Sequence, residues 1–457
     1  MNSNTDLGQG SVGKLLLKLS IPAIAAQLIN ALYNMVDRMY IGRIEGVGAL
    51  ALTGVGLCFP IIMIISAFSS FVGMGGAPIA AIRMGEKDEE GAEKILGNSV
   101  TVLFLLSVIL TVFFLLFKEK LLFWFGASND TIGFANSYLT IYVSGTIFVQ
   151  FALGLNPFIT TQGFSKTGML TVLIGAILNI VLDPIFIFGF GMGVQGAALA
   201  TILSQAVSAA WVLLFLLGKK TILRIKAKFL KINFKIMLPV FALGISPFIM
   251  QSTESLVNIS LNASLQRYGG DMAVGAITII SSIMQFCTMP MMGLTQGAQP
   301  IVSYNYGAKM YDRVRKTYHL LIIVMVMFST LLWASVQLFP QVFIGIFTND
   351  AALSAYTVNY LRIFMAMTLL LGLQFSCQQT FLALGRAKIS VILALLRKII
   401  LLIPLVFILG RYFGTTGVFV AEPVADAIAS LTTFFVFLFQ IRRILSDDPQ
   451  EGANGET

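Results

Sequence analysis

GKKTILRIKAKFLKINFK, residues 218–235, holds seven of the 30 Lys and Arg residues of a 457-residue chain and lies near its middle. Long apolar runs flank this stretch, and the chain is 57% hydrophobic but only 11% charged, whereas soluble domains carry about 25% charged residues. Lipid must therefore be the solvent for most of the chain. The stretch predicts a basic connection at 219–235 between a first half, 1–218, and a second half, 236–445, with a polar cytoplasmic tail at 446–457.

Apolar runs long enough to span a bilayer recur along both halves. They begin near Leu15, Gly48, Ile95, Ile132, Thr167, Val194, Ile236, Met272, Tyr318, Ala351, Ala387 and Thr415. We therefore expect an all-α, polytopic membrane protein of 12 transmembrane helices in two six-helix lobes.

The basic residues predict the orientation. With the N-terminus in the cytoplasm, 21 of the 30 Lys and Arg residues fall on that side. The positive-inside rule then places both the N- and C-termini in the cytoplasm, in a multi-pass protein of the cell membrane. Because the basic residues are scattered between apolar runs, without a stripe of interleaved aromatics, we expect no nucleic-acid partner.

The two halves repeat each other when the second is moved back by roughly 220 residues, as in other repeat proteins. The matching pairs are colinear: Pro22 with Pro239, Asp37 with Glu254, Pro78 with Pro300, Gly85 with Gly307, and Pro184 with Pro404. Each half has six helices, an even number, so both halves begin on the same side of the membrane. We therefore expect a pseudo-twofold axis along the membrane normal. The space between two such lobes is where transporters commonly bind substrate.

Polar side chains form one face of the first apolar helix. Asn30, Tyr33, Asn34 and Asp37 have the i, i+3, i+4, i+7 spacing of a single helical face. A carboxylate in a helix centre costs roughly 2.5–3.5 kcal/mol on insertion scales, so this face predicts a watery cavity. The alternative is an ion pair of Asp37 with Arg38, although adjacent residues point about 100° apart.

A second buried acid follows in the stretch NIVLDP, residues 179–184. Asn179 precedes Asp183 by one turn, and Pro184 frees a carbonyl group of the preceding turn. Counting about 1.5 Å per residue places Asp37, Asp183 and Thr201 at similar depths. This set predicts a site for a proton or a sodium ion; the alternative is a helix-breaking Asp-Pro pair near the outer rim.

The second half carries a different set of charges. Glu254 stands at the place of Asp37, on a face shared with Gln251, so it is expected to line a cavity. For Glu422 and Asp426, together with Arg397 and Lys398, we expect a structural ion-pair cluster. Methionines such as Met289 could form an adaptable wall for apolar ligands, or could be ordinary core residues.

The sequence does not favour an enzyme. It lacks a nucleophile paired with a base, a phosphate loop and a cluster with metal-ligand spacing, and its one histidine, His319, has no partner. We expect no cofactor other than the coupling ion, and a monomer.

Four stretches together resemble one family. They are YNMVDRMYIG at 33–42, GMGGAPIAAIRMGEKDEEGAEK at 73–94, NIVLDP at 179–184 and QGAQPIVSYNYGAK at 296–309. With them the chain resembles the multidrug and toxic compound extrusion transporters over residues 10–445. The resemblance implies a two-lobed carrier that exports diverse, often cationic drugs and is driven by protons, sodium ions or both.

The resemblance also implies roles for individual residues. Ion coupling would fall to Asp37, Asn179, Asp183 and Thr201, and the substrate cavity would be lined by Asn30, Tyr33, Asn34, Tyr138, Asn156, Gln205, Gln251, Glu254 and Met289. One branch of the family uses an acid on helix 10, but the matching stretch here, LLLGLQFSCQQT at 369–380, has none. This departure argues against a second sodium site and against coupling through Glu254.

A flippase for lipid-linked sugars or other lipids is the alternative with a similar two-lobed build. Such a protein would need basic residues in its central cavity to hold a diphosphate, whereas the acids found here favour cationic or neutral cargo.

Overall fold

The computed structural model describes residues 7–348 and 350–446, and every regular element among them is a helix. The predicted tail beyond Ser446 lies outside the described residues. The first half comprises α1 (Val12–Gly42), α2 (Gly48–Gly85), α3 (Glu89–Trp124), α4 (Ile132–Ser144), α5 (Thr146–Thr160), α6 (Ser165–Pro184), the π-helical turn η1 (Ile185–Gly189) and α7 (Val194–Leu217). The connection contains the short 3₁₀ helix η2 (Ala227–Phe229). The second half comprises α8 (Phe234–Gly307), α9 (Tyr311–Leu338), α10 (Pro340–Ile344), α11 (Ala351–Phe364), α12 (Thr368–Ala383), α13 (Ala387–Leu395), the π-helical segment η3 (Leu396–Leu402) and α14 (Ile403–Ile444).

These helices account for twelve membrane crossings within the described residues. Eight helices are long and apolar enough to span a bilayer, and the bent pairs α4–α5 and α11–α12 bring the total to ten. Two of these spans reverse direction within themselves, at Gly270 in α8 and at Gly414 in α14. Each therefore crosses twice, and the predicted all-α, twelve-helix architecture is confirmed.

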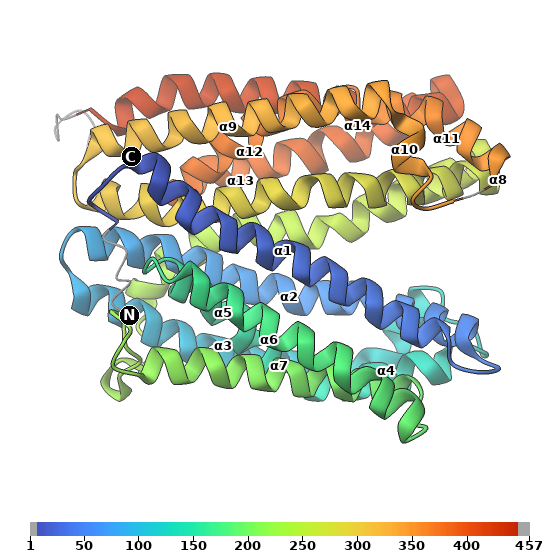
Figure 1. Ribbon diagram of the computed structural model, residues 1–457, viewed down its shortest axis with the longest axis horizontal. Coiled ribbons are helices and arrows are strands. Elements are labelled where there is room, and N and C mark those ends of the chain that lie inside the picture. Colours follow the sequence, from blue (N-terminus) through green and yellow to red (C-terminus); the bar gives the residue numbers. More distant parts are fainter. Residues whose placement is uncertain (1–6, 349, 447–457) are drawn as a thin grey trace.

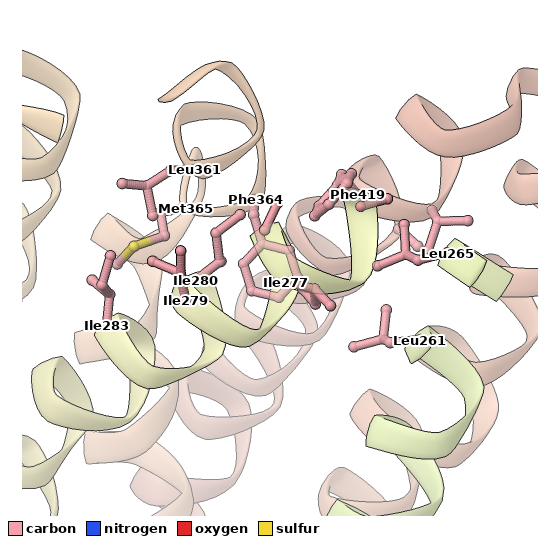
Figure 2. Packing of buried hydrophobic residues seen from close by; sticks show 14 of the residues in the cluster. Leu261, Leu265, Ile277, Ile279, Ile280, Ile283, Leu361, Phe364, Met365 and Phe419 are labelled. Carbon is pink, nitrogen blue, oxygen red and sulfur yellow. The ribbon is translucent and has the colours of Figure 1, made fainter. Parts of the chain in front are cut away.

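Glycine permits both reversals. Gly270 has φ 62° and Gly414 has φ 59°, a left-handed backbone conformation that a side chain disfavours. Apolar packing then holds the paired limbs together: Figure 2 shows Leu265 before the reversal of α8, Ile280 after it, and Phe419 of α14 in one buried cluster.

The helices form two bundles, one from each half (Figure 1). We call the end that holds the basic connection and the turns at 86–88 and 308–310 the basic end. The ribbons of the two bundles lie closest there and diverge toward the opposite end (Figure 1).

Glycines allow α2 and α8 to touch across the bundles in the halves nearest the basic end. A Cβ placed on Gly75 would lie 2.3 Å from the carbonyl oxygen of Val240, and one on Gly244 would lie 1.9 Å from that of Phe71. Phe71 also stacks on Phe241, with ring centroids 5.2 Å apart. Backbone contact this close requires small residues, as in other membrane helix pairs.

Helix α1 belongs to both bundles. Near the basic end, Leu16 and Leu19 pack in a cluster with Met291 and Leu321 of the second bundle. At its other end, Ile41 is part of a core cluster of the first bundle that includes Tyr138. The helix is continuous over its 31 residues, so it connects the core of one bundle to the core of the other.

The basic connection is fastened to the first bundle through Gln162. Its side-chain oxygen accepts hydrogen bonds from the Thr221 hydroxyl and from the backbone N–H groups of Ile222 and Leu223, at 2.8, 2.8 and 2.9 Å. Lys226 adds an ion pair to the buried Glu93, 2.5 Å away. The connection is thus an ordered part of the structure.

Candidate ion-binding and substrate site

The structure brings the four predicted coupling residues together in the first bundle. Asp37 comes from α1, Asn179 and Asp183 from α6, and Thr201 from α7. Asp183 and Asn179 are fully buried, at 0% and 1% exposure, and Thr201 is 9% exposed. Asp37, Asp183 and Thr201 are expected at similar depths in the membrane. The packing of α1, α6 and α7 brings them together.

Asn179 is the centre of the hydrogen bonding. Its Nδ2 donates to Oδ1 of Asp183 at 3.1 Å and to the hydroxyl oxygen of Thr201 at 3.4 Å. The Thr201 hydroxyl in turn donates to the carbonyl oxygen of Ala197 at 3.0 Å. This chain of donors fixes the amide, so that the side-chain oxygen of Asn179 points away from both partners.

Three oxygen atoms in this group are left without a donor. Oδ1 of Asp37, Oδ1 of Asn179 and Oδ2 of Asp183 are buried, and no hydrogen-bond donor among the described residues reaches them. Buried polar atoms are nearly always satisfied. Three unsatisfied acceptors in one place make this group a candidate site for a positive ligand.

The two carboxyl groups also lie within hydrogen-bonding reach of each other. Ionised carboxylates are acceptors only and have no hydrogen to share. Two like charges in one buried site repel strongly. The contact between Asp37 and Asp183 is therefore stable only when a proton or another cation lies at the pair.

Among the described residues, no basic side chain forms an ion pair with Asp37 or Asp183, although Arg38 lies within electrostatic range of Asp37. The guanidinium of Arg38 lies over the ring of Phe59, 5.6 Å from its centroid. No ion pair joins Arg38 to Asp37 in the parts of the chain that the structure describes. The alternative of an Asp37–Arg38 pair is therefore not what the structure contains.

The local sequence explains how Asp183 is presented. Pro184 ends the regular hydrogen bonding of α6, and the chain continues as a π-helical turn from Ile185 to Gly189. Such turns are frequent at functional sites.

Tyrosines surround the acidic pair. Tyr33 of α1 and Tyr138 of α4 lie within electrostatic range of Asp37, and the hydroxyl of Tyr138 is within hydrogen-bonding reach of Thr201. Tyr142 stacks on Tyr138, with centroids 6.2 Å apart and planes 14° apart. The sequence reasoning missed Tyr142, although it follows Tyr138 by four residues and thus shares its helical face.

The remaining first-bundle residues predicted to bind substrate are not all close to the acids. Asn30 and Asn34 are exposed on α1, where the Asn34 amide donates to the carbonyl oxygen of Asn30 at 2.7 Å. Asn156 on α5 donates to the carbonyl oxygen of Gly168 at 3.3 Å. Gln205 is half-buried on α7. Asn30 and Asn34 extend the polar face of α1 by up to two turns toward the basic end.

The second bundle corrects one expectation. Arg397 pairs with Asp426 at 2.8 Å and with Glu422 at 3.5 Å, as the predicted ion-pair cluster requires. Lys398, however, pairs with Glu254 of α8 and not with the two acids of α14. Adjacent side chains on a helix diverge by about 100°, so two consecutive bases reach different neighbouring helices.

The other predicted residues of the second bundle lie on α8. Gln251 has a buried side-chain oxygen without a partner among the described residues, and Met289 is half-buried. A further polar contact crosses between the bundles, where the Gln27 amide donates to the side-chain oxygen of Gln296 at 3.2 Å. The sequence reasoning missed Gln27, although it precedes Asn30 and Asn34 by three and seven residues on the same face of α1.

The oxygen atoms of Asp37, Asn179, Asp183 and Thr201 are suitable ligands for a hard monovalent cation or a proton. Carboxylate, amide and hydroxyl oxygens are the ligands that hard cations prefer. No group of three or more His, Cys, Asp or Glu residues that could hold a metal ion occurs in 7–348 and 350–446. If sodium binds, Asp37, Asn179, Asp183 and Thr201 would hold it.

A family model described as MatE matches residues 22–185 and 247–408, one segment in each half. Among curated proteins, the multidrug export protein MepA of Staphylococcus saprophyticus is 26% identical over 449 residues, covering 98% of both chains. MepA of Staphylococcus aureus is 26% identical over 444 residues and covers 97% of both.

Solved structures of similar proteins superpose on this chain over nearly its whole length. A multidrug resistance MATE family transporter in the outward-facing conformation superposes with a TM-score of 0.89 at 25% identity, covering 97% of this chain and 99% of that chain. A MATE protein in the bent conformation gives a TM-score of 0.90 at 25% identity, covering 97% and 98%. Both matches span the two bundles, so the likeness is to the entire architecture.

Proposed function

Because this chain belongs to the MatE family of membrane transporters, we propose that it exports structurally diverse organic compounds, many of them cationic, in exchange for protons or sodium ions. The observation that carries the proposal is the buried group of unpaired oxygens on Asp37, Asn179 and Asp183. An acidic site without a base of its own needs a cation, and a membrane supplies one through its ion gradient.

Exchange follows from competition for the same negative charge. With both carboxyl groups ionised, the first bundle attracts an organic cation to the face formed by Asn30, Tyr33 and Asn34. When a proton or sodium ion neutralises Asp37 and Asp183, that attraction is lost. A ligand shifts a conformational equilibrium only by its difference in affinity for the two states, and here the two ligands differ in which charge state of the acids they favour.

The orientation and assembly belong to the same proposal. We place the basic end, with both termini, in the cytoplasm of a cell-membrane protein, because the Lys and Arg residues are concentrated there. The ribbons of the two bundles diverge away from that end (Figure 1). Each bundle has its own buried core, and we propose that the chain works as a monomer.

The test is efflux of a fluorescent organic cation from proteoliposomes with a proton gradient and a sodium gradient imposed separately. We expect one gradient, or each in turn, to drive transport, and its dissipation to stop it. Asp37→Asn should remove the gradient dependence, whereas Asp130→Asn, which makes the same change at an exposed loop residue, should leave it intact. Transport of a lipid-linked sugar but of no organic cation would instead identify a flippase.

A further inference from the structure

The second bundle contains a group of charges, largely buried except at Glu254, that the proposed exchange does not use. We call it the second-bundle charge cluster, and its members are Glu254, Arg397, Lys398, Glu422 and Asp426. They come from three separate segments: α8, the π-helical segment η3 and α14.

The cluster contains three acids and two bases, so one acid has no base of its own. Lys398 is matched by Glu254, which it contacts directly. Arg397 must then serve both acids of α14, and its Nε approaches Oδ1 of Asp426 at 2.8 Å while its Nη2 lies 3.5 Å from Oε1 of Glu422. The first distance is a normal charge-assisted hydrogen bond and the second is longer than one.

Burial makes this imbalance significant. The side chains of Arg397, Glu422 and Asp426 are 12%, 10% and 2% exposed. Glu422 and Asp426 are four residues apart on one helix and so lie on the same face. Two carboxylates that share one guanidinium in such surroundings cannot both remain charged at low energetic cost.

Among the described residues, the neighbouring helix α12 adds no further charge to the cluster. From α12, the groups that face it are neutral: Gln374, whose side-chain oxygen accepts from the Ser430 hydroxyl at 3.2 Å, and Gln378, whose amide donates to the sulfur of Met250 at 3.4 Å. These two glutamines, with Arg397 and Lys398, line a small pocket beside the cluster. Its other lining residues, Met250, Phe375, Leu393 and Ala394, are apolar.

We propose that Glu422 holds a proton and that the second-bundle charge cluster is a proton-binding site, separate from the acids of the first bundle. With Glu422 neutral, Arg397 pairs with Asp426 alone and Lys398 with Glu254, which leaves no net charge. The proposal does not depend on the transported substrate or on which ion drives transport.

The test is infrared spectroscopy of the full-length protein in lipid nanodiscs, in the Asp37→Asn/Asp183→Asn background, which removes the acidic pair of the candidate ion site. We expect a C=O stretching band of a protonated carboxyl group to persist in this background. The band should move when glutamate is labelled with carbon-13 and stay in place when aspartate is labelled, and it should shift in deuterated buffer.

Substitutions then test the charge balance. Glu422→Gln should remove the band, and Asp426→Asn should remove it as well, because Arg397 would then be free to pair with an ionised Glu422. Arg397→Gln should strengthen it. Asp271→Asn, at an exposed acid of the same half, is the matched control and should change nothing.

Two results would overturn the proposal. One is the absence of any protonated-carboxyl band in the Asp37→Asn/Asp183→Asn protein, which requires no change in the cluster and so remains decisive if cluster variants do not fold. The other is a band that responds to aspartate labelling but not to glutamate labelling. Loss of gradient-driven transport in proteoliposomes has no bearing on either result, so the two proposals fail independently.

Discussion

Gly85, the last residue of α2, lies directly against the main-chain oxygen of Tyr304 near the end of α8: a Cβ at this glycine would be 2.0 Å from that oxygen. The contact is reciprocal, because a Cβ on Gly307 would lie 1.9 Å from the carbonyl oxygen of Ile82. Gly85 and Gly307 are equivalent in the internal repeat. The two bundles therefore meet at the basic end through one glycine from each half.

We predict that Gly85→Ala weakens this contact between the bundles. Overpacking a close contact costs about 1–3 kcal/mol, enough to lower the population of the arrangement seen here about tenfold. Spin labels on the basic-end turns at 86–88 and 308–310 should report a longer distance between the bundles. Gly56→Ala on the same helix, where a Cβ would meet nothing within 4 Å, should leave the distance as in the unmodified protein, and equal effects of both changes would refute the prediction.

A second prediction concerns binding of an organic cation to the purified protein at different pH values. Acidification protonates the pair Asp37 and Asp183, which removes negative charge, so affinity for the cation should fall by up to about tenfold per pH unit for each proton exchanged. In the Asp37→Asn/Asp183→Asn variant, equilibrium binding should no longer change with pH over the same range. Persistence of the full pH dependence in that variant, with Asp130→Asn as the control, would place the exchanged proton elsewhere.

Removing either partner of the ion pair between Glu254 and Lys398 should destabilise the protein, but by unequal amounts. The Lys398 side chain is only 14% exposed, whereas that of Glu254 is 52% exposed. Glu254→Gln strands the more buried charge and should destabilise the protein by about 1–3 kcal/mol; Lys398→Met leaves an acid that water can still reach and should cost less. Thermal unfolding in detergent measures both, and the double variant should recover much of the loss.

Gln162 provides a test of the connection between the halves. Gln162→Leu removes the acceptor for three hydrogen bonds and leaves the buried N–H of Leu223 unsatisfied, at a cost of about 1–3 kcal/mol. The basic connection contains several Lys and Arg residues, so trypsin should cleave the variant faster between residues 218 and 235. An equal increase in cleavage with Gln195→Ala, an exposed glutamine of the same half, would contradict this explanation.

Much of the fold follows from hydropathy, because an apolar run in lipid can satisfy its backbone only as a helix. The predicted starts at Gly48, Ile132, Val194, Ala351 and Ala387 are the observed helix starts. The bends are a different matter. The 57° angle between α4 and α5 and the 47° angle between α11 and α12 depend on how neighbouring helices pack, and hydropathy does not record packing.

The candidate sites divide in the same way. The meeting of Asp37 with Asp183 could be anticipated from depth, since residue counts from helix ends fix a level in the membrane. The partner of Lys398 could not, because depth alone does not say toward which helix a side chain points. The rule that adjacent residues diverge argues against pairing Asp37 with Arg38. The same rule applied to Arg397 and Lys398 predicts that these consecutive bases pair with acids on different helices.

The internal repeat duplicates the backbone but not its electrical character. Asp37 and Glu254 stand at equivalent places, yet only the second has a base in contact with it. Asp37 and Asp183 of the first bundle thus have no ion pair among the described residues, while in the second bundle two neighbouring bases pair with Glu254 and with Asp426. Two bundles with related backbones thus differ in their buried charge across the plane of the bilayer, and a mobile cation is expected to prefer the first bundle over the second.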